Sequence, residues 1–144
     1  MWPEKTGQAA VLDNDRSSKY SKRIMLVDDE ADILAVLAAS FRSGGFAIHA
    51  YTNPKQALED FKPHFYGALI LDVRMPVMDG FELYQMIRKI DPDVNVCFFT
   101  AYETSHDVYQ KTIAGVDKNA YFLRKPLSAR ELIKWVNTMI TSCK

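Results

Sequence analysis

Five short apolar runs recur along the chain, separated by polar and turn-forming segments. Runs of this length are typical of strands, and the third, which has no polar alternation, indicates a strand covered on both faces. We therefore predict five strands, at Lys22 to Val27, Phe46 to Tyr51, Gly67 to Leu71, Val94 to Phe99 and Ala120 to Leu123.

Between these runs, apolar residues recur at spacings of three and four, which predicts amphipathic helices. Asn53-Pro54 opens the second helix as N-cap and first-turn proline, and Ser128 to Glu131 has the capping-box pattern for the last. The fourth helix, Glu103 to Gly115, has the thinnest stripe and is expected to be the least firmly packed. The predicted stripes are Ile33, Leu34, Leu37 and Phe41; Ala57, Leu58 and Phe61; Leu83, Met86, Ile87 and Ile90; Val108, Thr112 and Ile113; and Leu132, Ile133, Val136, Met139 and Ile140.

Five strands alternating with five helices predict an α/β domain with a doubly wound parallel sheet, because parallel neighbours need crossovers of helical length. Residues 1–20 are polar and lack a period, so we expect a disordered leader, followed by one domain over residues 21–144. The chain ends soon after the last predicted helix, and no output domain is expected within it.

Composition excludes several classes of protein. The 144 residues are 48% hydrophobic and 25% charged, with a formal net charge of zero, so the basic surplus of a nucleic-acid binder is missing. No apolar run approaches the roughly 18 residues of a membrane span, and the N-terminus has no signal-like segment, so we expect a cytoplasmic protein. Cys97 and Cys143 are expected to be free thiols.

Polar groups follow four of the five predicted strands. Asp28-Asp29-Glu30 comes after the first, Asp72 after the third, Thr100 after the fourth and Arg124-Lys125-Pro126 after the fifth. Open α/β sheets bind their ligands outside the carboxyl ends of the strands. We therefore expect these residues around one crevice. Alone, Asp72 could equally be a turn former or helix cap, and the acidic triplet a helix start enriched in acids.

Three carboxylates in one crevice repel one another unless a cation compensates them. Oxygen ligands without Cys or His favour a hard ion, and open positions for water and a phosphoryl oxygen suit Mg²⁺ better than Ca²⁺ or Zn²⁺. The Lys125 ammonium and the Thr100 hydroxyl are suitable partners for phosphoryl oxygens. The set therefore indicates a phosphoryl-binding pocket in which Asp72 is the nucleophile.

These motifs resemble the response-regulator receiver domain of two-component signalling. The likeness runs from about Lys22 to Ile140 and includes Asp28-Asp29, the Asp-x-x-Met-Pro-x-x-Asp-Gly signature from Asp72 to Gly80, Thr100-Ala101 and Lys125-Pro126. It implies a flavodoxin-like fold with strand order 2-1-3-4-5 and a cis peptide before Pro126.

The resemblance also implies a role for each site residue. Asp72 would be the phosphoacceptor. Asp29, Asp72 and the backbone carbonyl of Arg74 would ligate magnesium, with Asp28 contributing through water. Thr100 and Lys125 would contact the phosphoryl group.

The family's switch implies a readout surface. Thr100 would move towards the phosphoryl group and Phe122 would turn into the vacated space, changing the face formed by the fourth helix, the fifth strand and the fifth helix. Arg74 and Tyr102 occupy positions that tune phosphoryl lifetime in the family, and they predict slow self-dephosphorylation.

Two other readings remain open at this point. Haloacid-dehalogenase-like phosphohydrolases also use an aspartyl nucleophile, but they carry an acid/base Asp two residues after it, where this chain has Arg74. A binding module that keeps the fold without using phosphorylation has no need of the full set of site residues. The favoured reading is a phosphoacceptor rather than an enzyme, supplied by a sensor histidine kinase or a histidine phosphotransfer protein, with phosphorylation-dependent homodimerisation left open.

Overall fold

The five predicted strands form one parallel sheet in the computed structural model, which describes residues 22–100, 120–125 and 127–141. The strand order is β2-β1-β3-β4-β5, as predicted. The register joins Leu26 to Ile70 across β1 and β3, and Phe98 to Phe122 across β4 and β5. The strands are β1 (Arg23–Val27), β2 (Ala47–Tyr51), β3 (Ala68–Leu71), β4 (Val96–Thr100) and β5 (Ala120–Arg124).

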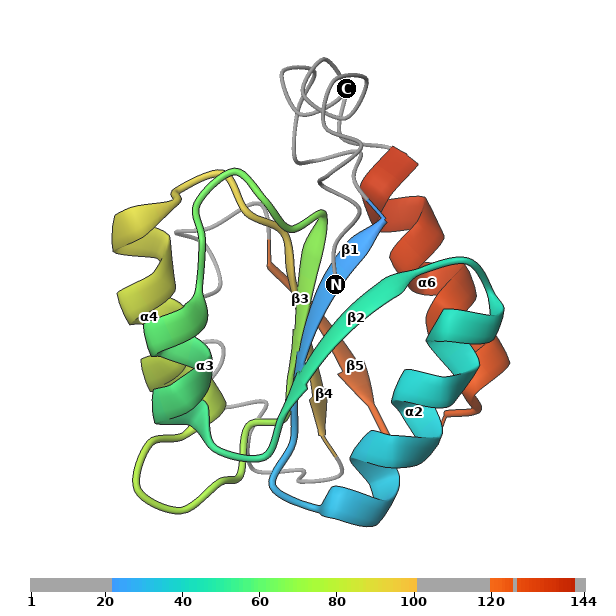
Figure 1. Cartoon of the computed structure of the whole chain (residues 1–144), viewed down its shortest axis with the longest axis horizontal. Helices are drawn as coiled ribbons and strands as arrows, with labels where there is room; N and C mark the ends of the chain where they lie inside the picture. The colour runs from blue at the N-terminus through green and yellow to red at the C-terminus, as the bar shows by residue number, and fades with distance from the viewer. Residues whose placement is uncertain (1–21, 101–119, 126, 142–144) are drawn as a thin grey trace.

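Helices cover both faces of this sheet (Figure 1). Within the described ranges there are four helices, and the fifth that we predicted, at Glu103 to Gly115, lies outside those ranges. In Figure 1, α3 and α4 lie on one side of the sheet and α2 and α6 on the other, which is the doubly wound arrangement. The helices are α2 (Ala31–Ser43), α3 (Pro54–Asp60), α4 (Gly80–Ile90) and α6 (Ala129–Thr141).

The sheet separates two hydrophobic cores. Successive residues of a strand point to opposite faces, so Met25 and Val27 enter the core beneath α3 and α4, whereas Ile24 and Leu26 enter the core beneath α2 and α6. All four side chains are at most 1% exposed. Burial on both faces is why β1, β3 and β4 appear in the sequence as continuous apolar runs, whereas the edge strands β2 and β5 are only partly buried.

Two of the predicted helical stripes were partly wrong. Met86 and Ile90 of α4 are 43% and 46% exposed, whereas Tyr84, which we left out of the stripe, is fully buried. The Tyr84 ring packs edge-on against Phe98 of β4, so aromatic packing rotates the buried face of α4. In α2, Ile33 is 36% exposed, and Ala38 is buried instead.

Side chains cap three of the helices. Asn53 accepts a hydrogen bond from the backbone N–H of Lys55, and Ser128 and Glu131 form the predicted capping box of α6. A second capping box joins Asp79 and Glu82 at the start of α4. These bonds satisfy backbone donors that have no partner inside their helix.

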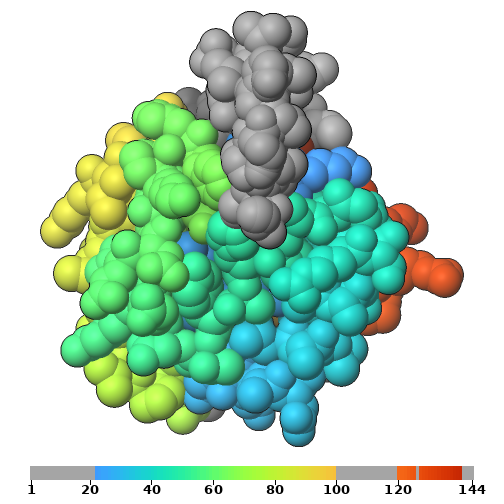
Figure 2. All heavy atoms as spheres, in the orientation of Figure 1, coloured from blue at the N-terminus to red at the C-terminus, as the bar shows by residue number. Residues whose placement is uncertain are grey.

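Figure 2 views the molecule from the β2 edge of the sheet, where residues of α2, β2 and α3 (cyan to green) fill the surface. None of the helices in the described ranges has the length and apolar content needed to cross a bilayer.

Candidate functional site

Three carboxylates meet where β1 and β3 end. One oxygen from each of Asp28, Asp29 and Asp72 lies within 4.8 Å of the others. The backbone N–H of Asp72 donates to the carbonyl of Val27 at 2.9 Å, so the two strand ends are held together by a sheet hydrogen bond. In Figure 1 the loops that follow β1 and β3 lie side by side at the lower edge of the sheet. The predicted convergence of polar residues at the strand ends therefore holds for these three carboxylates.

The three carboxylates differ in their access to solvent. Asp28 is 2% exposed and Asp72 is 7% exposed, whereas Asp29 is exposed. Buried carboxylates are costly unless hydrogen bonds or cations compensate their charge. Asp28 accepts a hydrogen bond from the backbone N–H of Glu30 at its Oδ1 atom, at 2.9 Å.

Lys125 supplies a cation at the edge of the cluster. Its Nζ lies 3.1 Å from Oδ2 of Asp28, and only 15% of its side chain is exposed. The same ammonium lies over the ring of Phe99, 5.4 Å from the ring centroid. Lys125 follows β5 directly, so this ion pair joins the ends of the first and last strands.

Gly80 allows α4 to begin against the end of β3. Its backbone N–H donates to the carbonyl of Val73 at 3.0 Å. A methyl group at Gly80 would overlap the carbonyl oxygen of Asp72, so any other residue would force the two segments apart. Gly80 is therefore a close-approach site at the first position of α4.

The remaining predicted residues lie around the cluster to different extents. Thr100 ends β4, and its backbone is in register with Arg124 of β5, but its side chain lies outside the described part of the chain. Phe122 is half-buried and packs against the core beneath α3 and α4. The Arg74 side chain is exposed. Tyr102 and Pro126 lie outside the described residues.

The donor set fits a hard divalent cation. Among the described residues this is the one group of three carboxylate, imidazole or thiolate side chains close enough to share an ion. It contains oxygen ligands alone, and such sets select Mg²⁺ or Ca²⁺ over Zn²⁺. Cys97 is not a member of this group, and complete burial raises the pKa of its thiol far above the usual range and keeps it protonated.

Two features of the site had no signal in the sequence. Phe99 belongs to an apolar strand, and nothing in its neighbours indicates that its ring meets a cation. Val77, in the loop after Asp72, has a φ of 72° and is 80% exposed. A β-branched residue rarely adopts this left-handed conformation, and only the folded backbone shows it.

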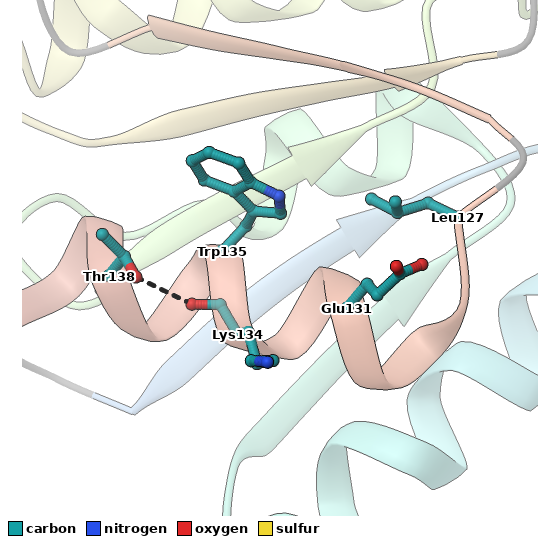
Figure 3. Close-up of a pocket in the computed structure, with 5 residues that line it drawn as sticks. All are labelled: Leu127, Glu131, Lys134, Trp135 and Thr138. Atoms are coloured by element: carbon teal, nitrogen blue, oxygen red, sulfur yellow. Dashed lines mark hydrogen bonds between the residues drawn. The ribbon is translucent and has the colours of Figure 1, made fainter.

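A separate hollow lies on the outer side of α6. It has a volume of about 300 Å³ and is lined by Leu127, Glu131, Lys134, Trp135 and Thr138. Figure 3 shows these side chains along α6 and the segment before it, with the Thr138 hydroxyl donating to the backbone carbonyl of Lys134. Trp135 is 48% exposed. None of the acidic residues of the cluster lines this hollow.

Comparison with known proteins agrees with the fold and the motifs. The chain is 32% identical over 120 residues to the transcriptional regulatory protein PrrA of Mycobacterium tuberculosis, covering 83% of this chain and spanning about half the length of PrrA. It is 29% identical over 119 residues to the response regulator receiver protein CpdR of Brucella abortus, covering 83% of this chain and 97% of CpdR.

A solved structure gives the same result. The response regulator TrrA of Thermotoga maritima, crystallised in complex with Mg²⁺ and BeF, superimposes with a TM-score of 0.67 at 29% identity, covering 81% of this chain and 97% of TrrA. The family model of the response regulator receiver domain matches residues 24–137. The chain therefore belongs to the response regulator receiver domain family.

Proposed function

We propose that this receiver accepts a phosphoryl group on Asp72 from a phosphohistidine of a sensor kinase or histidine phosphotransfer protein. One observation supports this above all: Asp28, Asp29 and Asp72 share a 4.8 Å cluster that Lys125 borders through its ion pair with Asp28. Asp72 is held by the backbone at a strand end, so its carboxylate is presented to a partner in a fixed position.

The transfer needs one bond to form and one to break. A carboxylate oxygen of Asp72 attacks phosphorus, and the P–N bond to the partner's imidazole breaks. The electron pair of that bond returns to the imidazole nitrogen, leaving an acyl phosphate on Asp72. Lys125 then shifts its ammonium from Asp28 to an oxygen of the phosphoryl group, and Thr100 donates its hydroxyl to another.

Mg²⁺ is the cation that best suits this pocket. Asp28, Asp29 and Asp72 would hold it, together with the backbone carbonyl of Arg74. When bound it neutralises charge on the carboxylates and on the transferring group. The Mg²⁺ and BeF in the TrrA structure are in keeping with this proposal.

The surface built from residues 103–115, β5 and α6 would carry the signal onward. Phe122 of β5 is half-buried, so a rotation of its ring changes both the core and the surface. Trp135 and the hollow on α6 give this helix an apolar feature for a partner to recognise. The chain would act in the cytoplasm, as a phosphoacceptor whose only chemistry is its own phosphorylation and dephosphorylation.

Labelling with a small-molecule phosphodonor in the presence of Mg²⁺ tests the proposal. We expect one modified side chain, mapped by mass spectrometry to Asp72, and no label in Asp72→Asn. Lys125→Ala should still be labelled without switching, as read from the amide shifts of β5 and α6. Asp60→Asn, an exposed carboxylate on α3, is the matched control and should be labelled like the parent. Label that persists in Asp72→Asn would contradict the proposal.

A further inference from the structure

The ammonium of Lys125 lies between two groups of different chemistry. One is the carboxylate of Asp28, at 3.1 Å, and the other is the ring of Phe99, at 5.4 Å from its centroid. The Asp28 side chain is 3% exposed and Phe99 is 4% exposed. Both attractions therefore operate largely away from water, where they are stronger than at an open surface.

The ring of Phe99 offers something that core packing alone does not require. Phe98 and Phe99 are neighbours on β4 and point to opposite faces of the sheet. Phe98 packs edge-on against the rings of Phe81 and Tyr84, at centroid distances of 4.8 and 5.6 Å. An aliphatic side chain could fill the core at Phe99, but only an aromatic ring presents a negative face to a cation.

We propose that Phe99 is a positioning residue for Lys125. Its ring and the Asp28 carboxylate together hold the ammonium at the edge of the acidic cluster in the unphosphorylated chain. In this position Lys125 occupies one oxygen of Asp28 and adds a positive charge beside the cluster. Keeping the ammonium there therefore opposes the binding of a divalent cation. The inference rests on the proposed function, since it concerns how readily the same pocket takes its metal ion.

A double-mutant cycle tests the inference. MgCl₂ alone is titrated into the full chain, and Mg²⁺ binding is monitored through the amide chemical shifts of residues 28–30 and 72–74. Phe99→Leu should bind Mg²⁺ about two- to thirtyfold more tightly than the parent, the range expected when one cation–π contact is lost at a site between exposed and desolvated. In a Lys125→Gln background the same Phe99→Leu change should leave the Mg²⁺ affinity unchanged.

Two controls separate positioning from packing. Phe99→Tyr keeps the ring and should have the Mg²⁺ affinity of the parent. Phe98→Leu removes a ring from the same strand on the other face of the sheet, and it should leave the Mg²⁺ affinity unchanged in both backgrounds. If Phe99→Leu does not fold, as judged by thermal unfolding, Phe99→Met takes its place with the same expected results.

The possible results are distinguishable. An equal gain in Mg²⁺ affinity with and without Lys125, no gain when Lys125 is present, or a Phe99→Tyr variant that behaves like Phe99→Leu would each overturn the positioning role while leaving the proposed function intact. A parent chain that binds no Mg²⁺ and takes no label would overturn the proposed function, and the inference with it.

Discussion

Val77 has an unfavourable backbone conformation and a side chain that is exposed to solvent. Its φ of 72° lies in the left-handed region. Its side chain is 80% exposed, so hydrophobic burial offsets little of the free-energy cost of this backbone conformation. Left-handed conformations cost an L-residue about 1–2 kcal/mol, and β-branching makes them worse. The strain lies in the loop that follows the proposed phosphoacceptor, where strained residues are often found.

Val77→Gly should therefore stabilise the fold. We expect the free energy of unfolding to rise by about 1 kcal/mol, because glycine adopts this conformation without steric cost. Urea unfolding measures the change. Val36→Gly is the matched control, since Val36 is 63% exposed within α2. Glycine is a poorer helix former than valine, so the free energy of unfolding of this variant should fall by about 0.5 kcal/mol. A Val77→Gly variant no more stable than the parent would show that the strain is relieved elsewhere.

Gly80→Ala should have the opposite effect. The added methyl group overlaps the carbonyl oxygen of Asp72, which is backbone and has no alternative rotamer. Overpacking of this kind costs about 1–3 kcal/mol, and here it also displaces Asp72. We expect a lower free energy of unfolding in urea and slower labelling of Asp72 by the phosphodonor. Unchanged stability and labelling would mean that α4 can slide away freely.

At the scale of whole elements, hydrophobic patterning predicted the five strands, most plainly β1, β3 and β4, which are buried on both faces. The order of the strands in the sheet came from the resemblance to receiver domains. The same patterning failed for α4, where Met86 and Ile90 are exposed and Tyr84 is buried. A tyrosine is ambiguous in a sequence, and its burial is decided by the Phe98 ring on a strand that comes later in the chain. Contacts between distant segments, such as Phe99 with Lys125, have no periodic signal.

The capping box of α4 should contribute measurably to stability. Asp79 accepts from the backbone N–H of Glu82 at 2.8 Å, and Glu82 accepts in return from the N–H of Asp79 at 2.9 Å. Asp79→Ala should lower the free energy of unfolding by about 1 kcal/mol in urea, whereas Asp79→Asn should cost much less because asparagine also caps. Equal losses in the two variants would assign the effect to charge rather than to capping.

At the scale of the whole molecule, His49 gives the fold a dependence on pH. Its Nδ1 atom lies 2.7 Å from the hydroxyl of Tyr66, which is 1% exposed. Burial lowers the pKa of His49, and so do Lys62, Arg23 and Arg42, whereas Asp60 raises it. The folded chain therefore favours the neutral imidazole more than the unfolded chain does.

Stability should accordingly fall as the pH drops below the unfolded pKa of about 6.5, because the unfolded chain then binds the extra proton. Above that pH the contribution of His49 is fully present. His49→Gln can keep a hydrogen bond to Tyr66 without titrating. We expect the parent to lose more stability than His49→Gln between about pH 7.5 and 5.5 in urea unfolding. Parallel losses would contradict the lowered pKa.

The ion pair between Asp28 and Lys125 joins residues 97 positions apart. During synthesis, the acidic residues leave the ribosome long before Lys125, so a growing chain carries Asp28 without its cationic partner. The pairing at this edge of the sheet is therefore complete only after β5 and Lys125 have been translated and β5 has joined the sheet.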